Sequence, residues 1–430
     1  MNRKFNLSED WSSTIMGCFI ILLMLLLYTF NMSIKWPTFA WTSSSELFGK
    51  VFALANLGRT IVVLAISFLI VCITNMMSGK VLKDNMGYLA LFALTFVAMA
   101  LAGNKVMSDW GIETVIFSLL IGLFVSNFFK IPEWLKGALS SELYIKIGLV
   151  LMGTTVLFDR LLQLGAVGLL QSVFVVFGVW YFSFWLCKKF KIDEEMAMML
   201  SSGVSICGVS AAVATAGAIK GDKTKLSFVV SLVLVVAVPM IFMMPALARL
   251  LNLDAILAGA WIGGTVDTTA AVVATGAMYG EVAEKSAVII KSSQNVLLGV
   301  AAFLISIYWT YKQSKGKTVE ETKYADKPST KVLWERFPKF VLGFLAASLL
   351  FSFIIDPSAN RPAMGAIRSM QGLFFALAFT SIGLETSFKN FITQGNRKAT
   401  FAFIIAQTFN VIFTLLIIYL LHYLVGYPAM

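Results

Sequence analysis

The sequence predicts an all-α membrane protein, a polytopic transmembrane helical bundle. Hydrophobic residues make up 58% of its 430 residues and charged residues only 13%, whereas about 25% of the residues in a soluble domain are charged. The apolar residues form blocks of about 17 to 28, and a helix needs roughly 20 residues to cross about 30 Å of hydrocarbon. A soluble globular domain is therefore excluded.

The hydropathy pattern divides the chain into up to thirteen membrane segments. The first follows Arg3 and Lys4 like a secretory signal, but no small-x-small cleavage site appears before Asn31, so we expect an uncleaved helix. The predicted segments are 12–30, 58–78, 86–103, 111–129, 140–158, 163–187, 193–218, 223–250, 254–278, 282–310, 335–356, 368–387 and 397–425.

The net charge of +11 resides mainly in the short loops between these segments. Cationic loops are typical of the cytoplasmic side of a membrane protein, so we favour topology over nucleic-acid binding as their cause. The opposite loops carry about half as many cations, with Lys220, Lys223 and Lys225 as an exception. We expect a cytoplasmic N-terminus and an external C-terminus. The cytoplasmic set comprises Arg3, Lys4, Lys80, Lys83, Lys130, Lys136, Lys188, Lys189, Lys191, Arg249, the Lys312 to Lys339 stretch, Lys389, Arg397 and Lys398.

An internal repeat indicates a transporter architecture. Residues 153–165 align without a gap with residues 383–395, at an offset of 230, matching both glycines and a phenylalanine. The preceding segments also end alike, with Phe128 to Pro132 resembling Phe353 to Pro357. Seven predicted helices separate the copies, and an odd number places them in opposite orientations, as in inverted-repeat transporters. Chance matches in a sequence of low complexity are the alternative.

The repeat and one hydrophilic stretch define the expected domains. Residues 86–310 form the first transporter half. Residues 311–334, rich in Lys, Glu, Thr and Ser, form a cytoplasmic linker. Residues 335–430 form the second half, an inverted copy of about 111–187.

Two segments are interrupted by small and polar residues, Ser201 to Gly217 and Gly263 to Gly276. Non-helical backbone at membrane depth is tolerated only where protein or a water-filled cavity covers it. The N-terminus of each half-helix then presents partial positive charge to an anion. We expect the two interrupted helices to share one site, although close helix packing would also explain the small residues.

Ionisable and amide side chains lie in or beside the second interrupted segment. Asp267 is the acidic residue set deepest in an apolar segment, which makes it a candidate site for a coupling Na⁺ or proton. Lys291, Gln294 and Asn295 share one helix face by their spacing. Lys291 either pairs with Asp267, a pair that could be purely structural, or meets an anionic substrate. Glu385, Lys146 and His422 are weaker candidates near helix ends.

The sequence lacks the usual signatures of catalysis or cofactor binding. We find no paired carboxylates in a glycosidase-like context, no phosphate-binding loop, and no cluster with metal-ligand spacing. The four cysteines have neither metal nor disulfide spacing. We therefore expect no enzyme activity, no cofactor and no bound metal beyond a coupling ion.

The stretch from Ser202 to Ala212 resembles the signature of the YeiH-type family of predicted sulfate exporters. The resemblance runs from about Ile112 to Leu424. It implies a bacterial inner-membrane protein related to bile-acid and arsenite carriers, with inverted repeats and two broken helices crossing near the midplane. It further implies that residues 1–85 are additional N-terminal membrane helices outside the family core. The resemblance also implies that Ser205, Cys207, Gly208 and Ser210 line the crossing and that Lys291 is the family's membrane lysine.

This sequence departs from the family pattern at the site. Where relatives often carry a His-Asp pair and a nearby Gln, it has Asp267, Thr268 and Ala271, and Gln294 replaces a common Arg. The substrate therefore stays open among sulfate, sulfite, another oxyanion and an organic acid. The expected substrate-binding residues are Ser205, Cys207, Gly208, Ser210, Thr265, Thr268, Thr269, Lys291, Gln294 and Asn295, with Asp267 for the coupling ion.

These observations favour a secondary transporter, with export as one option, that carries a small anionic solute by alternating access. An ion channel built from the same polar segments is the main rival, and a membrane enzyme is a third alternative. The expected partners are the solute, Na⁺ or H⁺ and the lipid bilayer, without nucleic acid. Whether the chain forms a homodimer stays open.

Overall fold

The computed structural model describes residues 7–30, 32, 34–80, 85–109, 114–314, 334, 337–355, 360–386 and 396–427. Most of the predicted 311–334 linker, and residues 387–395 of the second repeat copy, lie outside these described residues. Within them, seven helices are long and apolar enough to cross a membrane. The prediction of an all-α, multi-pass membrane protein is thus confirmed. These helices are Glu9–Thr29, Leu54–Met77, Phe158–Lys189, Lys223–Leu250, Glu281–Trp309, Arg361–Glu385 and Arg397–Leu424.

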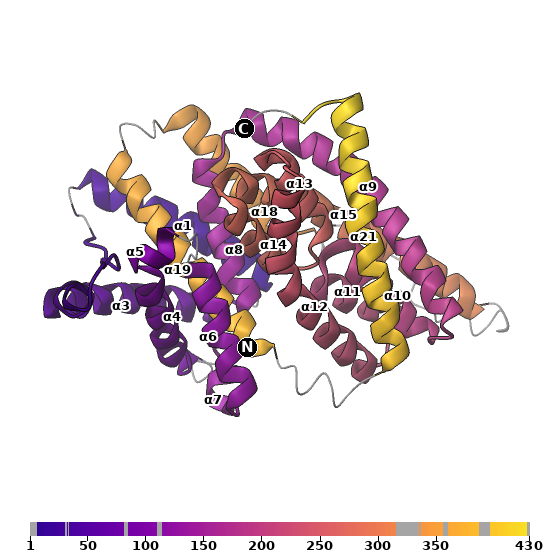
Figure 1. Ribbon diagram of the computed structural model, residues 1–430, viewed down its shortest axis with the longest axis horizontal. Helices are drawn as coiled ribbons and strands as arrows, with labels where there is room; N and C mark the ends of the chain where they lie inside the picture. Colours follow the sequence, from indigo (N-terminus) through magenta and orange to yellow (C-terminus); the bar gives the residue numbers. More distant parts are fainter. Residues whose placement is uncertain are drawn as a thin grey trace, which may run out of the picture. The chain divides into compact units, whose positions relative to one another are not determined.

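The chain forms two compact units. Unit 1 comprises Met1–Asp159 and Lys339–Ser387, and unit 2 comprises Arg160–Pro338 and Phe388–Met430. The ranges 86–310 and 335–430 expected from the sequence therefore each contribute to both units. The main helices of unit 1 are α1 (Glu9–Thr29), α3 (Leu54–Met77), α4 (Tyr88–Ala102), α6 (Thr114–Phe128), α8 (Ser141–Met152), α18 (Phe340–Leu349) and α19 (Arg361–Glu385), with short helices α2 (Ser44–Glu46), α5 (Lys105–Asp109) and α7 (Glu133–Lys136) (Figure 1).

Two glycines of unit 1 make equivalent close contacts with neighbouring helices. A Cβ atom added to Gly383 of α19 would lie 2.5 Å from the carbonyl oxygen of Leu119 of α6. A Cβ atom added to Gly153, directly after α8, would lie 2.5 Å from the carbonyl oxygen of Phe344 of α18. Gly153 and Gly383 correspond at the repeat offset of 230 residues. Leu119 and Phe344 correspond at the offset that relates Phe128 to Phe353.

The two copies also run in opposite directions within unit 1. The hydroxyl of Ser141, at the start of α8, donates a hydrogen bond to the carboxylate of Glu385, at the end of α19, over 2.7 Å. Helices α8 and α19 pack against each other and are therefore antiparallel. The matched glycine contacts and this orientation support the inverted repeat that the sequence predicts.

Unit 2 contains four long helices, α9 (Phe158–Lys189), α12 (Lys223–Leu250), α15 (Glu281–Ser314) and α21 (Arg397–Leu424) (Figure 1). Helix α9 begins two residues before the boundary of the unit. The 28 residues of α12 rise about 42 Å at 1.5 Å per residue, which exceeds the roughly 30 Å of a hydrocarbon core. The four long helices surround the two interrupted segments.

The first interrupted segment is a re-entrant hairpin, here called hairpin 1. Its first arm is α10 (Glu194–Ser202) with the π-helix η4 (Gly203–Cys207), and its second arm is α11 (Val209–Ile219). Lys225 lies in the first turn of α12, directly after hairpin 1. Its ammonium contacts the carboxylate of Asp193, just before α10, at 2.8 Å and the carboxylate of Glu195, in α10, at 3.1 Å. The chain has therefore returned to the end at which it entered.

The second interrupted segment, hairpin 2, turns back in the same way. Its arms are α13 (Ala255–Thr265) and α14 (Thr269–Tyr279). The hydroxyl of Tyr279, at the end of α14, donates to the carbonyl oxygen of Leu253, just before α13. Hairpin 1 ends where α12 begins and hairpin 2 begins where α12 ends, so the hairpins enter unit 2 from opposite ends of α12.

Both predicted interruptions are present, but the two segments do not span the membrane as the ranges 193–218 and 254–278 suggested. Each has the length of a span and turns back halfway. This path removes Lys220, Lys223 and Lys225 as an exception in the charge pattern, but it moves Arg249, in the last turn of α12, to the opposite end from Lys188. Lys225, with neighbouring Lys220 and Lys223, lies at the same end of unit 2 as Lys188, because Lys188 and Lys225 contact adjacent carboxylates of one short stretch.

Candidate functional site

The tips of the two hairpins touch in the interior of unit 2. A Cβ atom added to Gly208, at the tip of hairpin 1, would lie 3.0 Å from Cγ2 of Thr268 and 3.3 Å from Cβ of Asp267, at the tip of hairpin 2. It would also lie 2.9 Å from Val233, ten residues into α12. Gly208 has φ 62° and ψ −114°, a conformation that only glycine adopts without strain.

Lys291 of α15 connects the two tips. Its side chain is 1% exposed, and Nζ donates to the carbonyl oxygens of Ile206 and Val266, the latter at 2.9 Å, and to Oε1 of Gln294 at 2.9 Å. An ammonium has three N–H donors, so all three are used. The two carbonyls lie at the C-terminal ends of η4 and α13, where the helix dipole places partial negative charge.

Amide side chains bind the remaining carbonyls at these ends. Nε2 of Gln294 donates to Ser205 O at 2.8 Å and to Gly264 O at 3.4 Å. From α21, Nε2 of Gln407 donates to Thr265 O at 3.0 Å, and Nδ2 of Asn410 donates to Thr265 O at 3.2 Å and to Val204 O at 3.1 Å. The negative ends of the first arms are thus compensated by donors from α15 and α21.

The N-terminal ends of the second arms are less well compensated. Helix α11 begins after Gly208 and has no side-chain cap, whereas Thr268 caps α14 by accepting from the N–H of Ala271 at 3.1 Å. The first N–H groups of a helix have no partner within the helix, and they carry its partial positive charge. The meeting point of the tips therefore favours negative charge.

Several buried oxygens around hairpin 2 lack a hydrogen-bond partner among the described residues. They are both carboxylate oxygens of Asp267, Oγ1 of Thr265, Oδ1 of Asn295 and Oε1 of Gln407. Asp267 is 2% exposed, and burying a carboxylate without a partner is costly. Carboxylate, amide and hydroxyl oxygens are ligands for hard cations, so a proton or a small cation at Asp267 would relieve this cost.

Most of the residues predicted from the sequence come together here. Lys291 and Gln294 bind backbone atoms of both tips, and Nδ2 of Asn295 donates to Oγ1 of Thr269 at 3.1 Å. Cys207 is buried beside Gly208, and Ser210 is half-buried in the first turn of α11. The hydroxyl of Ser205 donates to Ser201 O at 2.7 Å, so the carbonyl of Ser205, not its hydroxyl, meets Gln294.

The Lys291 ammonium does not donate to Asp267, because its three hydrogen-bond partners are Ile206, Val266 and Gln294. The two opposite charges interact without a direct hydrogen bond. Glu385 and Lys146 lie in unit 1, where the ammonium of Lys146 contacts Asp10 at 2.8 Å. His422 lies in the last turn of α21. The described hydrogen bonds at the tips involve none of these three weaker candidates.

Sequence reasoning missed Gln407 and Asn410. Both are buried in α21, at 3% and 1% exposure, and they occupy one face three residues apart. The available signal was their position in an otherwise apolar span, since buried amides in membrane helices need hydrogen-bond partners.

Fold and site define a multi-pass helical membrane protein in which two re-entrant hairpins meet inside one compact unit. The chain belongs to the family described as Conserved hypothetical protein 698, whose model matches residues 86–402. This confirms the family resemblance seen in the sequence.

The chain is similar to curated relatives named UPF0324 membrane protein. One from Rhodopirellula baltica is 38% identical over 81% of this chain and 65% of the relative. Another, from Nitratidesulfovibrio vulgaris, is 36% identical over 81% and 61%, and one from Nitrosomonas europaea is 29% identical over 74% of each. The chain thus spans slightly less than two thirds of the first two relatives. No solved structure matches.

Proposed function

We propose that the chain is a secondary carrier of a small anion, coupled to a proton or Na⁺ at Asp267. One observation carries the proposal. At the touching tips, the carbonyl ends of both hairpins are bound by Lys291, Gln294, Gln407 and Asn410, while the N-terminal end of α11 has no side-chain cap. This asymmetry favours an anion.

The solute would lie against the first turns of α11 and α14. Backbone N–H groups are suitable donors for the oxygens of sulfate, sulfite or another oxyanion, and a small organic acid offers the same carboxylate chemistry. Lys291 contributes a positive charge without contacting the solute, since its donors are already used. The residues that would line the site are Ser205, Cys207, Gly208, Ser210, Thr265, Thr268, Thr269 and Asn295.

Asp267 supplies a physical basis for coupling. Its negative charge offsets that of Lys291, so an anion meets a positive site only after Asp267 has been neutralised. A proton would do this directly. Na⁺ could also be held by the carboxylate with the partnerless oxygens of Thr265 and Asn295. Anion and cation would then bind together.

The hairpins also suggest how access alternates. They enter from opposite ends of α12, so each one separates the tips from one side of the membrane. We propose that the protein lies in a bacterial inner membrane with a cytoplasmic N-terminus and a cytoplasmic basic end, defined by Lys188 and Lys225. The direction of transport follows the gradients that the cell maintains.

The test is uptake of labelled sulfate, sulfite and small organic acids into liposomes containing the purified protein, with imposed pH and Na⁺ gradients. We expect flux of at least one anion, increased by one gradient, and loss of that increase in Asp267→Asn. Lys285→Met on α15, six residues before Lys291 and paired with Glu281 at the start of the helix, is the control. Gradient-driven flux that persists unchanged in Asp267→Asn would overturn the coupling assignment.

An ion channel is the second candidate, because the tips could open as a continuous polar path. Planar bilayers distinguish the two: a channel gives resolvable unitary currents, whereas a carrier turns over too slowly to do so. Unitary currents carried by an anion would replace the carrier proposal with a channel at the same tips.

A further inference from the structure

Unit 2 also contains an apolar groove that the proposed transport does not use. A cavity of about 240 Å³ lies between α9 and α15, with α10 contributing Met198. Phe177, Trp180 and Phe184 form one wall, and Leu297 and Leu304 belong to the other. We propose that this groove binds an acyl chain of an anionic phospholipid, whose headgroup contacts Lys188 and Lys312.

The chemistry of the walls fits a hydrocarbon chain. The lining residues are apolar or aromatic, and Nε1 of Trp180 donates to Ser202 at 3.1 Å. The hydroxyl of Tyr308 approaches Glu194 at one end of the groove, at 3.3 Å. A polar solute would therefore find few partners along the groove.

The dimensions and exposure of the groove fit a lipid of one leaflet. From Leu297 to Tyr308 along α15, the helix rises about 16 Å at 1.5 Å per residue. One leaflet contributes about 15 Å of the roughly 30 Å hydrocarbon core. The groove opens outward, since Phe177 is 44% exposed, Tyr181 64% and Leu304 47%. An acyl chain can thus enter from the side.

The basic end of the groove supplies the headgroup contacts. Lys188 contacts Glu194 at 3.3 Å and lies 5.7 Å from the ring of Phe184. Lys312 contacts the same glutamate and lies 5.8 Å from the ring of Trp309. Each ammonium has three donors, so one shared carboxylate does not satisfy both lysines.

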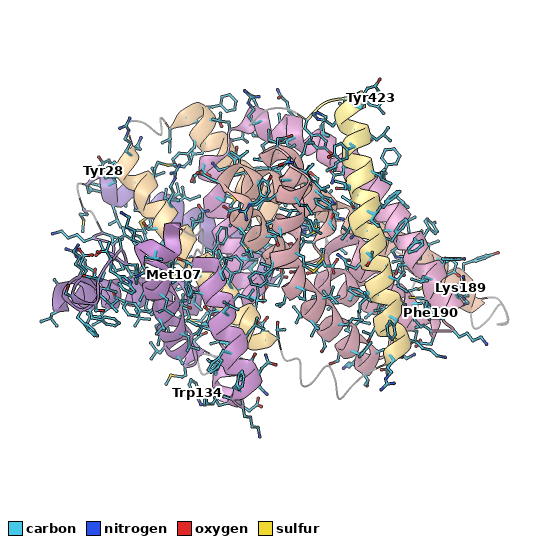
Figure 2. All side chains as sticks on the ribbon, viewed as in Figure 1. Tyr28, Met107, Trp134, Lys189, Phe190 and Tyr423 are labelled. Carbon is cyan, nitrogen blue, oxygen red and sulfur yellow. The ribbon has the colours of Figure 1, made fainter. Side chains whose placement is uncertain are left out.

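The net charge at this end is positive. Lys189 lies at the end of α9, beside Phe190 in Figure 2, and 5.2 Å from the ring of Trp185. The other nearby carboxylates, Asp193 and Glu195, are both contacted by Lys225. The four lysines Lys188, Lys189, Lys225 and Lys312 thus outnumber the three carboxylates by one, and basic clusters of this kind attract anionic headgroups of the cytoplasmic leaflet.

A bound lipid would act on hairpin 1. Met198 of α10 packs with Ile219 of α11 and Ile305 of α15 beneath the groove, so both arms of the hairpin contact its floor. An acyl chain that fills the groove adds contacts to this cluster. We therefore expect the lipid to stabilise hairpin 1 and the unit that contains it.

The experiment compares two lipids that differ in headgroup charge. Full-length protein is delipidated in detergent and supplied with dioleoyl phosphatidylglycerol or dioleoyl phosphatidylcholine, and the melting temperature and the bound lipids are measured, the latter by native mass spectrometry. We expect phosphatidylglycerol to raise the melting temperature by several degrees more. We also expect the double variant Lys188→Gln, Lys312→Gln to lose the difference in melting temperature between the two lipids. Ala301→Trp fills the groove, so it should retain one bound lipid fewer than the wild type.

The control is Lys50→Gln, an exposed lysine of unit 1 paired with Glu46, which should behave as wild type. Equal stabilisation by both lipids, unchanged in the double lysine variant, would overturn the proposal even if Ala301→Trp failed to fold. A dimer that forms through this groove and excludes lipid would overturn it as well. Neither readout depends on transport, so the outcome is independent of the proposed function.

Discussion

Nζ of Lys291 lies 2.9 Å from the carbonyl oxygen of Val266, at the point where α13 ends and hairpin 2 turns. The same ammonium binds Ile206 of hairpin 1. A single buried cation thus holds together two interruptions of the chain that are about 60 residues apart. The proposed anion site depends on this contact, because open carbonyls at both tips would otherwise repel an anion.

Replacing Lys291 by Met should destabilise unit 2. The change leaves buried carbonyls and the Gln294 amide oxygen without their donor, and each unsatisfied buried acceptor costs about 1–3 kcal/mol. We expect a loss of roughly 3 kcal/mol in the free energy of unfolding, measured by denaturant titration in detergent. Lys285→Met should cost less than about 1 kcal/mol, because its ion pair with Glu281 is near the surface. Equal losses would show that Lys291 does not hold the tips.

Gly208→Ala tests the contact between the tips. The new Cβ would meet Val233 at 2.9 Å and Thr268 at 3.0 Å, in a backbone conformation that alanine rarely adopts. We expect a cost of about 1–3 kcal/mol and at least tenfold slower anion uptake into liposomes. The matched control is Gly203→Ala in η4, whose nearest contact is Val233 at 3.4 Å. Similar uptake by both variants would contradict the tip contact.

The sequence predicted which segments are helical and apolar but not the path of the hairpins. A re-entrant segment of about 25 residues has the composition of a span, since both arms are buried in protein at membrane depth. The only local sign was the cluster of Lys220, Lys223 and Lys225 on the wrong side of a thirteen-span topology. A contact between distant residues, Lys225 and Asp193, was needed to reveal the turn.

Only part of the candidate site could be predicted from the sequence, because its remaining contacts also join distant parts of the chain. Helical spacing correctly placed Lys291, Gln294 and Asn295 on the face that meets the hairpins. The spacing could not show that Lys291 binds backbone carbonyls instead of Asp267, because the ends of half-helices present acceptors that no residue pattern reveals. Gln407 and Asn410 come from α21, more than 100 residues away along the chain.

The inverted repeat predicts matched effects at Gly153 and Gly383. Alanine at either position would place Cβ 2.5 Å from a backbone carbonyl oxygen of a neighbouring helix, so the helices would have to separate. We expect each variant to lower the free energy of unfolding by about 1–3 kcal/mol. Gly372→Ala in α19 meets nothing within 4 Å and should stabilise slightly, because alanine favours helix. Opposite effects of Gly153→Ala and Gly383→Ala would argue against equivalent packing.

The acid sensitivity of hairpin 1 should depend partly on Asp222, the N-cap residue of α12. Its carboxylate accepts from the N–H groups of Lys225 at 2.9 Å and Thr224 at 2.8 Å, which holds the pKa of Asp222 below its usual value. A lowered folded-state pKa means that this stabilisation is present above the unfolded-state pKa, about 3.9, and is lost as pH falls through the folded-state pKa.

Asp222→Ala should therefore lower the melting temperature at pH 7, and the difference from wild type should shrink below about pH 5. Asp222→Asn is the matched control, because asparagine caps a helix without titrating. It should retain most of the stability at every pH. A difference between Asp222→Ala and wild type that stays constant from pH 7 to the lowest pH tolerated would contradict the assignment.

The central claim is that an anion binds at the touching tips. The most direct test measures the melting temperature of the purified protein with sulfate, sulfite, thiosulfate and small organic acids. Each anion is tested with and without Na⁺ and at several pH values. A ligand of the folded state raises this temperature with concentration as RT ln(1 + [L]/Kd) implies. We expect at least one anion to do so, more strongly at low pH or with Na⁺, and expect Asp267→Asn to lose that dependence. Stabilisation by cationic or neutral solutes but by no anion would contradict the account.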